Sequence, residues 1–238
     1  MITMRDEYHK WHSPNLGRDM ELKIFGHGGT PLLVFPTSMG RFFQYPDMGM
    51  IAAVGSKYEN GQLQAFCVDS VDAESFYNKG VAPKVRVARH NQYEQYLLHE
   101  VLPFIRSRNP GPLAVTGCSF GGYHAVNFAL RHPDAVSACV SMGGAFDIKQ
   151  FLDGYYDQDC YYHNPPDYLP NLDDGWYWDR YQRMKLVLVT GENDICLGDN
   201  RRLAGILGSK SIPHHLDVWG NDTGHDWPWW RQMAVKFF

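Results

Sequence analysis

Short apolar runs recur along the chain, each bounded by glycine, proline or aspartate. From residue 31 onward most of them are nearly continuous in apolar residues, which is typical of strands buried on both faces of a parallel sheet. The runs are ELKIFG (21–26), PLLVFP (31–36), LQAFCVD (63–69), PLAVTG (112–117), ACVSMGG (138–144), KLVLVTG (185–191) and HLDVWG (215–220). They predict a mostly parallel central sheet.

Segments with the apolar spacing of helices lie between these runs. The clearest cover residues 91–107, 120–133, 198–209 and 227–238. Strand and helix therefore alternate through the chain, as a parallel sheet with helices on both faces requires. We expect one α/β domain over residues 1–238, since this length is routine for a single core.

One stretch, at about residues 148–183, breaks the alternation and is crowded with tyrosine, tryptophan, aspartate and proline. Connections longer than about 12 to 15 residues are usually functional or disordered, and this one is too aromatic for easy disorder. We interpret it as an insertion near the functional site, where it would suit an apolar or aromatic group. Ordinary packing of a lid explains the same composition equally well.

Composition and charge narrow the range of partners. The 238 residues are 44% hydrophobic and 20% charged, with a net charge of -4 and no long run of like charges. Neither nucleic acid nor an anionic membrane is therefore expected as a partner. No window approaches about 18 apolar residues and the N-terminus lacks a signal-like run, so we expect a cytoplasmic protein. The five cysteines include no CxxC pair and are expected to be reduced and structural.

The strongest chemical signal is GCSFG at residues 117–121, directly after an expected strand. A tight strand-to-helix turn strains the backbone at its central residue, and it needs small residues two positions before and two after. Gly117 and Gly121 supply them around Ser119. The turn would present the serine hydroxyl as a nucleophile and place the N–H of Phe120 at a helix N-terminus, where a developing oxyanion is stabilised.

A serine nucleophile needs a histidine base at the same edge of the sheet. Among eleven histidines, His225 follows the last expected strand and directly precedes the final helix. Asp226 can cap that helix, with Pro228 in its first turn. His214 and His215 lie at the opposite, amino end of that strand. His124 and His132 belong to the helix after Ser119 and are interpreted as structural.

The base in turn needs an acid to orient its imidazole. The segment after the strand 185–191 offers Glu192, Asp194 and Asp199. Asp194 is far enough from the strand to bend over its end, whereas Glu192 is expected in the turn and Asp199 as the N-cap of the next helix. We therefore expect Asp194 to be the acid.

The chain resembles the α/β-hydrolase superfamily in three motifs, GCSFGG, TGENDICLGD and GHDWPWWRQ. More specifically, it is similar to the esterase family that includes esterase D, S-formylglutathione hydrolases, feruloyl esterases and mycolyltransferases. The resemblance runs from about residue 32 to 238, and DCYYHNPPDYLPNL also resembles the aromatic insertion of that family. It implies an α/β-hydrolase fold with Ser119 as nucleophile, His225 as general base and acid, and Asp194 as orienting acid.

The sequence departs from many relatives at the second oxyanion donor. No HGGG motif follows the early strand, and VFPTSMGRFF occupies its place, with Pro36-Thr37 where many relatives have His-Gly. By position we expect the backbone N–H of Ser38 to be this donor, with Met39 as the second choice.

These residues together predict a serine esterase that hydrolyses a small-molecule ester through an acyl-enzyme. We expect no metal or organic cofactor, and a homo-oligomer is left open. A thioesterase or acyltransferase would use the same three residues and differ only in the acceptor. A non-catalytic binding module on a hydrolase scaffold is the remaining alternative, because fold alone does not determine function. Against it stands the presence of competent residues at all three positions.

Overall fold

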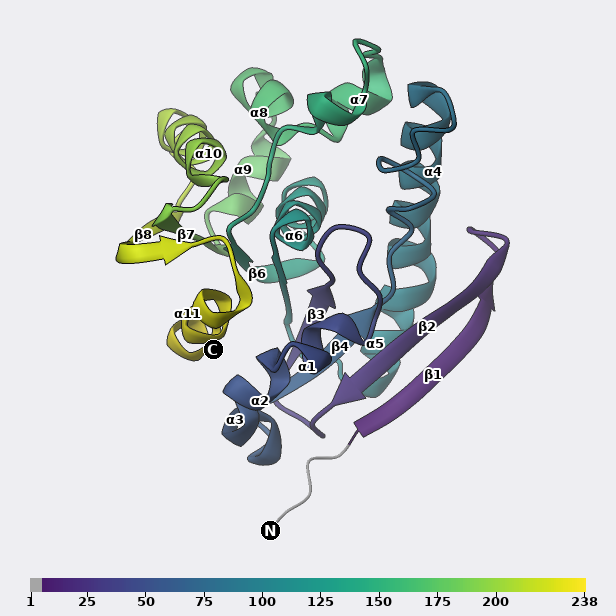
Figure 1. Ribbon diagram of the computed structural model, residues 1–238, viewed down its shortest axis with the longest axis vertical. Helices are drawn as coiled ribbons and strands as arrows, with labels where there is room; N and C mark the ends of the chain where they lie inside the picture. The colour runs from purple at the N-terminus through teal and green to yellow at the C-terminus, as the bar shows by residue number, and fades with distance from the viewer. Residues whose placement is uncertain (1–5) are drawn as a thin grey trace.

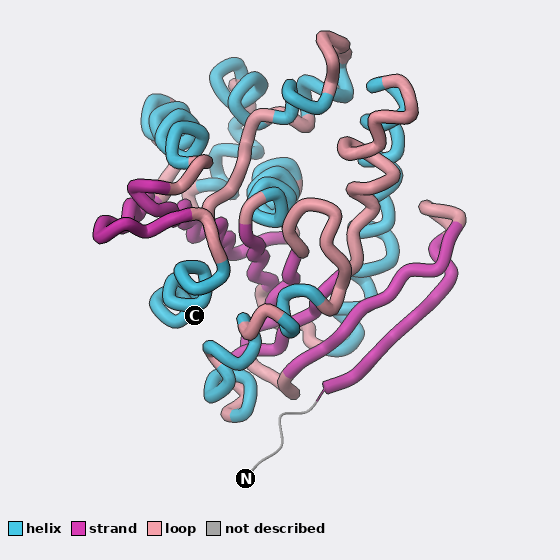
Figure 2. Tube along the Cα trace, in the orientation of Figure 1, coloured by secondary structure: helices cyan, strands magenta, loops and turns pink. Residues whose placement is uncertain are grey.

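A single mixed sheet runs through the computed structural model, which describes residues 6–238 (Figure 2). Its eight strands are β1 (Asp6–Ser13), β2 (Arg18–Phe25), β3 (Thr30–Phe35), β4 (Leu63–Val68), β5 (Leu113–Cys118), β6 (Val136–Met142), β7 (Lys185–Asn193) and β8 (His215–Gly224). Their order across the sheet is β1-β2-β4-β3-β5-β6-β7-β8. The β1–β2 and β2–β4 pairs are antiparallel, and every pair from β4 to β8 is parallel. The predicted mostly parallel sheet is thus confirmed.

Strand β1 was not expected from the apolar pattern. It pairs with β2 along its whole length, from Asp6 opposite Phe25 to Ser13 opposite Arg18. Its residues alternate between exposed and partly buried positions, and its sequence DEYHKWHS contains no apolar run. Polar and charged side chains are common on an edge strand because they discourage pairing with other chains.

Helices cover both faces of the sheet (Figure 1). One face carries α4 (Pro83–Tyr96), the π-helical turn η1 (Leu97–Val101), α5 (Leu102–Arg108), α6 (Phe120–Arg131) and α10 (Leu197–Ser209). The other carries α1 (Gln44–Asp47), α2 (Met50–Ala53), α3 (Gly55–Glu59) and α11 (Trp227–Phe237). The short helices α1 to α3 were not expected, and the helix expected at 91–107 begins earlier, at Pro83.

The aromatic stretch folds into short helical pieces above α6. They are η2 (Ile148–Phe151), α7 (Gln158–Tyr162), α8 (Pro165–Tyr168), η3 (Leu169–Asn171) and α9 (Gly175–Tyr181). The hydroxyl of Tyr123 on α6 donates to the carbonyl of His163 at 2.9 Å. The hydroxyl of Tyr181 donates to the carbonyl of Leu130 at 2.6 Å. Helix α6 is therefore enclosed by the sheet below and this segment above.

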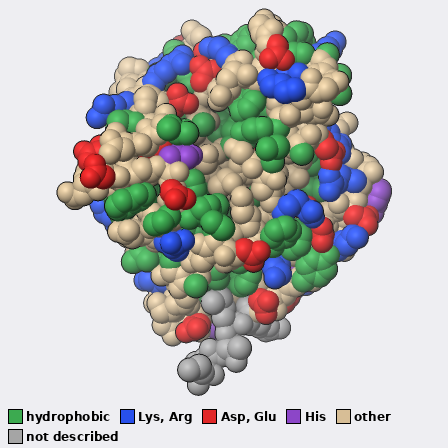
Figure 3. Space-filling model, viewed as in Figure 1, with side chains coloured by type: hydrophobic (Ala, Val, Ile, Leu, Met, Phe, Trp, Pro, Cys, Tyr) green, Lys and Arg blue, Asp and Glu red, His purple; other side chains and the backbone are tan. Residues whose placement is uncertain are grey.

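The surface carries charges of both signs, and acidic and basic side chains are interspersed over the face in Figure 3. All five cysteines are buried and free of disulfides. Within residues 6–238, no helix combines the length and apolar character needed to cross a membrane.

A buried ion pair joins α4 to the end of α6. The carboxylate of Glu94 accepts hydrogen bonds from Arg131 Nε at 2.5 Å and Nη2 at 2.8 Å, and its Oε1 lies 2.9 Å from His132 Nε2. Burial alone would raise the pKa of Glu94, but the hydrogen bonds from His132 and Arg131 outweigh burial and hold the pKa well below its ordinary value. This carboxylate is therefore ionised in the folded protein and stabilised by its partners.

Replacing Glu94 by glutamine should lower the free energy of unfolding by about 3 kcal/mol at pH 7, because the partly buried Arg131 would lose its charged partner. A carboxyl whose pKa is depressed by folding stabilises the protein above the pKa of the unfolded chain, and this contribution disappears as the pH falls. Wild type should therefore lose more stability than Glu94→Gln between about pH 5 and pH 2. Urea unfolding at a series of pH values measures the difference.

The matched control for this experiment is Glu59→Gln, which changes an exposed glutamate at the end of α3. It should unfold at the same urea concentration as wild type at pH 7. An identical pH dependence for Glu94→Gln and wild type would contradict the role given to the buried pair.

Candidate active site

Three of the predicted site residues lie at the same edge of the sheet. Ser119 directly follows β5, Asp194 directly follows β7 and His225 directly follows β8. These strands are parallel, so their carboxyl ends meet at one edge, where ligands bind in sheets of this type. The topology therefore brings together side chains that are up to 106 residues apart in the chain.

The backbone at Ser119 adopts a conformation that few non-glycine residues occupy, with φ 55° and ψ −123°. The chain passes very close to itself on either side of this residue. A Cβ on Gly117 would lie 2.3 Å from the carbonyl carbon of Gly121, and a Cβ on Gly121 would lie 2.4 Å from the carbonyl oxygen of Pro36. Only glycine fits at both positions, which agrees with the turn expected from the sequence.

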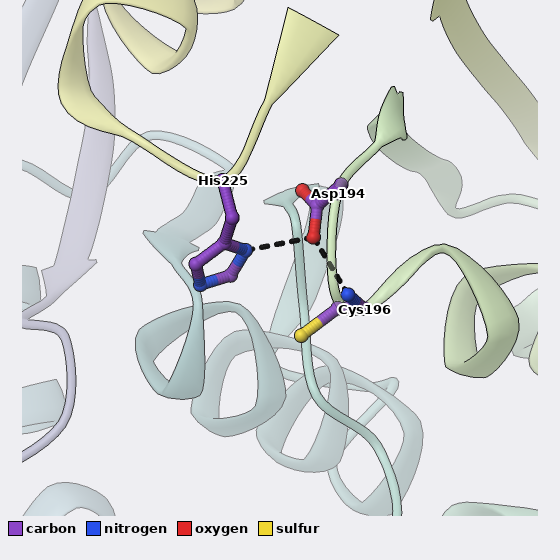
Figure 4. Close-up of side chains that lie close together, drawn as sticks. All are labelled: Asp194, Cys196 and His225. Carbon is purple, nitrogen blue, oxygen red and sulfur yellow. Dashed lines mark hydrogen bonds and ion pairs between the residues drawn. The ribbon is translucent and has the colours of Figure 1, made fainter.

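A continuous chain of hydrogen bonds links the three side chains. The hydroxyl of Ser119 lies 2.9 Å from Nε2 of His225. On the other side of the ring, Nδ1 of His225 lies 2.7 Å from Oδ1 of Asp194, the contact drawn in Figure 4. Since a carboxylate only accepts, Nδ1 donates to Asp194 and Nε2 is left to accept from the serine.

Asp194 is buried and held in place by its own neighbourhood. Its Oδ1 also accepts the backbone N–H of Cys196 at 2.7 Å, the second dashed contact in Figure 4. Burial pushes the pKa of Asp194 upward, but the hydrogen bonds from His225 and from the Cys196 N–H outweigh burial, so the pKa lies below its ordinary value. The carboxylate is thus ionised and oriented toward the imidazole.

The two other acids considered from the sequence, Glu192 and Asp199, form hydrogen bonds with other partners than His225. Glu192 lies within β7, not in the turn after it, and it accepts the N–H of Asp222 at 2.8 Å. Asp199 is not the N-cap of α10, because that position belongs to Cys196. It lies instead in the first turn of α10, where its Oδ2 accepts the N–H of Phe146 at 2.9 Å.

The residues that follow His225 in the chain hold its ring in place. Asp226 is the N-cap of α11, and its side chain accepts the Trp227 N–H at 2.7 Å, as the sequence suggested. The indole of Trp230 packs edge-on against the His225 ring, with centroids 4.9 Å apart and an interplanar angle of 86°. The start of α11 therefore determines where the imidazole lies.

Gly143, at the end of β6, is a site residue that was not predicted. Its φ is +58°, and a Cβ placed there would lie 2.6 Å from Oδ2 of Asp194 and 3.1 Å from Nδ1 of His225. The signal was present as the Gly143-Gly144 pair directly after an expected strand. The need for glycine at this position comes from residues about 50 to 80 positions further along the chain, so the local sequence pattern did not reveal it.

The loop after β3 contributes Ser38 to the cavity that Ser119 also lines. The N–H of Thr37 donates to Oε1 of Gln44 at 2.9 Å, and the N–H of Met39 donates to Oδ2 of Asp72 at 3.1 Å. The N–H of Ser38, which lies between these two residues, has no hydrogen-bond acceptor among the described residues 6–238. Phe120 begins α6, so its N–H has no partner inside the helix.

A cavity of about 450 Å³ opens beside Ser119. Its wall includes the predicted Ser38 and Phe120, together with aromatic and polar side chains. The other lining residues are Tyr77, Ala145, Gln150, Phe151, Ile195, Cys196 and Asp199. Two residues of the aromatic stretch therefore reach the cavity, and both belong to its first helical turn.

Two further hollows of similar volume, about 470 and 490 Å³, are lined by residues around the end of α6 and by α9. Neither includes Ser119, Asp194 or His225. Five residues of the aromatic stretch line the first of these, namely Tyr162, Tyr168, Leu172, Trp176 and Tyr177. We assign the chemistry to the cavity at Ser119, because it alone of the three contains a nucleophile hydrogen-bonded to a base.

Asp194, Cys196 and His225 offer ligand atoms that all lie within 4.8 Å of one another. Burial raises the pKa of the Cys196 thiol to about 12. A metal would require the thiolate form and would also have to break the 2.7 Å contact between Asp194 and His225. The donor set therefore fits an acid–base pair beside a neutral thiol better than a metal centre.

The family model for putative esterases matches residues 15–236 of the chain. A search of curated proteins finds no match. The fold is similar to that of a ferulic acid esterase, with a TM-score of 0.80, 15% identity, and 99% of this chain and 96% of the other covered. It is also similar to S-formylglutathione hydrolase from Staphylococcus aureus, with a TM-score of 0.75, 18% identity and 98% and 96% coverage.

The S-formylglutathione hydrolase from Agrobacterium tumefaciens has the same architecture, with a TM-score of 0.78, 12% identity and 99% and 94% coverage. The expected α/β-hydrolase fold is thereby confirmed. The chain belongs to the esterase family, and it is an enzyme of the carboxylic-ester hydrolase class.

Replacing Gly143 by alanine should lower kcat/KM by roughly 100-fold, because the new methyl group would push Asp194 and His225 out of alignment. Gly154→Ala is the matched control: its φ is also positive, at +85°, but no atom lies within 4 Å of a Cβ at that position. Both variants should lose stability from backbone strain, and only Gly143→Ala should lose activity. Equal kcat/KM values for the two variants would contradict this placement of Gly143.

Proposed function

We propose that the protein hydrolyses carboxylic esters through an acyl-enzyme on Ser119, with His225 as general base and acid and Asp194 as the acid that orients the imidazole. The observation that carries this proposal is the unbroken contact chain: 2.9 Å from the serine hydroxyl to His225 and 2.7 Å from His225 to Asp194. A serine hydroxyl becomes an effective nucleophile when an adjacent base accepts its proton.

In the first half-reaction, Oγ of Ser119 forms a bond to the ester carbonyl carbon while its proton passes to Nε2 of His225. The electron pair of the carbonyl bond moves to oxygen and creates an oxyanion. The bond from carbon to the alcohol oxygen then breaks, and His225 gives its proton to the departing alkoxide. An alcohol leaves, and the acyl group remains on Ser119.

In the second half-reaction, water takes the place of the alcohol. His225 accepts a proton from water as the water oxygen bonds to the acyl carbon, and a second oxyanion forms. The bond between that carbon and Oγ of Ser119 breaks, and His225 returns the proton to the serine. The ionised Asp194 stabilises the imidazolium that exists during both half-reactions.

We further propose that the oxyanion is held by the backbone N–H groups of Ser38 and Phe120. Support for Ser38 over the second choice, Met39, comes from the neighbouring bonds, because the Met39 N–H already donates to Asp72 at 3.1 Å. Fixed backbone donors in such a position stabilise the transition state without reorganising during the reaction. The start of α6 adds the positive end of its dipole at Phe120.

The walls of the cavity suggest the kind of ester. Tyr77, Phe120 and Phe151 provide aromatic surface, and Asp199 is the one charged side chain that lines the cavity in the described residues 6–238. We infer that a neutral ester with an aryl or other apolar group is preferred over an anionic one. A structural neighbour named ferulic acid esterase is in keeping with an aromatic substrate.

Changing Ser119 to alanine should reduce the hydrolysis of p-nitrophenyl 3-phenylpropionate by about 10⁴-fold or more, since the acyl-enzyme can no longer form. The same change should abolish covalent labelling by a fluorophosphonate, which mass spectrometry would locate on Ser119 in wild type. Circular dichroism and thermal unfolding verify that the variant is folded. Undiminished hydrolysis by folded Ser119→Ala would refute the proposed mechanism.

Changing Asp194 to asparagine should lower kcat by roughly 10⁴-fold, because the amide would favour the wrong tautomer of His225. Asp199→Asn is the matched change at the other acid after β7, and it should lower kcat far less because Asp199 contacts the Phe146 N–H and not the imidazole. Steady-state kinetics on both variants decide between the acids. A larger loss for Asp199→Asn at equal stability would assign the role to Asp199.

A further inference from the structure

Asp72 is a buried carboxylate that contacts two separate parts of the active site. It follows β4 and is 1% exposed. Its Oδ2 accepts the N–H of Met39 at 3.1 Å, and its Oδ1 lies 2.9 Å from Nε2 of His124. A carboxylate in such a position is costly to bury unless its hydrogen bonds are satisfied, so both contacts matter to its placement.

The first contact anchors the loop that carries Ser38. The peptide group before Thr37 is held by Gln44, which accepts the Thr37 N–H at 2.9 Å, and the peptide group before Met39 is held by Asp72. Peptide groups are planar, so fixing one on each side of the Thr37–Ser38 peptide restricts how that peptide can rotate. The direction of the Ser38 N–H is set by these two anchors.

The loop is also held at Gly40. The N–H of Gly40 donates to the Thr37 carbonyl at 2.8 Å, and the Gly40 carbonyl accepts the hydroxyl of Ser70 at 2.8 Å. Met39 itself has a φ of 55°, which an unrestrained methionine seldom adopts. The Asp72 contact therefore supports a strained residue next to Ser38.

The second contact ties this loop to α6. His124 lies one turn after Phe120 on that helix, and their rings pack edge-on with centroids 4.8 Å apart. Asp72 thus connects the loop containing one proposed oxyanion donor with the helix that supplies the other. A shift of this carboxylate would change the separation between the N–H groups of Ser38 and Phe120.

We propose that Asp72, oriented by His124, is a positioning residue that aligns the two donors of the oxyanion hole. This inference rests on the proposed function, because it assumes that the N–H groups of Ser38 and Phe120 bind the oxyanion. A displacement of reacting groups by about 1 Å can cost about 100-fold in rate. The effect should appear in the tetrahedral state and not in the binding of an unreacted ligand.

The test compares two ketones that differ in their ability to form a tetrahedral adduct. 1,1,1-Trifluoro-4-phenylbutan-2-one accepts Oγ of Ser119 at its carbonyl carbon, the serine proton passes to His225, and the carbonyl electron pair becomes an oxyanion. 4-Phenylbutan-2-one has a similar shape but a much less electrophilic carbonyl group. The ratio of their inhibition constants reports how well the oxyanion is held.

Asp72→Asn should raise the inhibition constant of the trifluoromethyl ketone by roughly 100-fold and lower kcat/KM to a similar extent. The amide can accept from one partner only, and its NH₂ group would face the other donor. The inhibition constant of 4-phenylbutan-2-one should stay unchanged. An unchanged ratio of the two constants, or an equal loss for both ketones, would overturn the positioning role.

A second pair of variants keeps the test valid if Asp72→Asn does not fold. His124→Leu removes the group that faces Asp72 Oδ1, whereas His124→Gln retains an N–H at a similar distance along the side chain. We expect His124→Leu to weaken inhibition by the trifluoromethyl ketone selectively and His124→Gln to restore it. Equal inhibition of these two variants would also overturn the proposal.

Glu94→Gln provides the matched control, because it disturbs a buried carboxylate–histidine pair at the opposite end of α6. It should lower stability while leaving the ratio of the two inhibition constants unchanged. Ser119→Ala separates the two levels of inference. Retained hydrolysis in Ser119→Ala would refute the proposed function, whereas an inactive Ser119→Ala together with an unchanged ratio in Asp72→Asn would refute only the role of Asp72.

Discussion

The close passage of three backbone segments at Ser119 is the constraint on which the rest of the site depends. The end of β5, the start of α6 and the loop after β3 approach so closely that a Cβ at Gly121 would lie 2.4 Å from the carbonyl oxygen of Pro36. The strained conformation of Ser119, with φ 55°, costs on the order of 1–3 kcal/mol. Burial of almost the whole of α6 offsets that cost, because the helix is enclosed on both sides.

Three buried carboxylates, each paired with a histidine, organise the polar interior of the protein. Asp194 faces His225, Asp72 faces His124, and Glu94 faces His132 together with an arginine. In a low-dielectric interior an unpaired carboxylate is expensive, so each pair strongly favours one arrangement of the segments that it joins. The first pair bears directly on the proposed chemistry, the second on the loop after β3, and the third on stability at the far end of α6.

The aromatic stretch serves two different surfaces. Its first turn reaches the cavity beside Ser119 through Gln150 and Phe151, whereas its later tyrosines and tryptophan line a hollow near the end of α6. Its last helical piece also contacts α6, because the hydroxyl of Tyr181 donates to the carbonyl of Leu130. Membership of the esterase family is compatible with such variation, because substrate preference in a shared fold is set by the segments that extend beyond the sheet.

Local features of this protein could be predicted from its sequence. The turn at Ser119 could be predicted because the close approach of Gly117 to Gly121 lies within one short stretch of sequence. The mostly parallel sheet could be predicted because strands buried on both faces are apolar along their whole length. Since each expected strand end lies at one edge of such a sheet, Ser119, Asp194 and His225 could be selected by their positions after strands.

Other features were decided only by the tertiary structure. The edge strand β1 has no apolar run and is recognisable through its pairing with β2. Gly143 lies against side chains that the sheet brings from 51 and 82 positions away. The acceptor of the Met39 N–H is a carboxylate 33 residues further along the chain. Apolar periodicity reports burial of a residue in its own element, whereas close approaches and hydrogen-bond partners between distant segments exist only once the chain has folded.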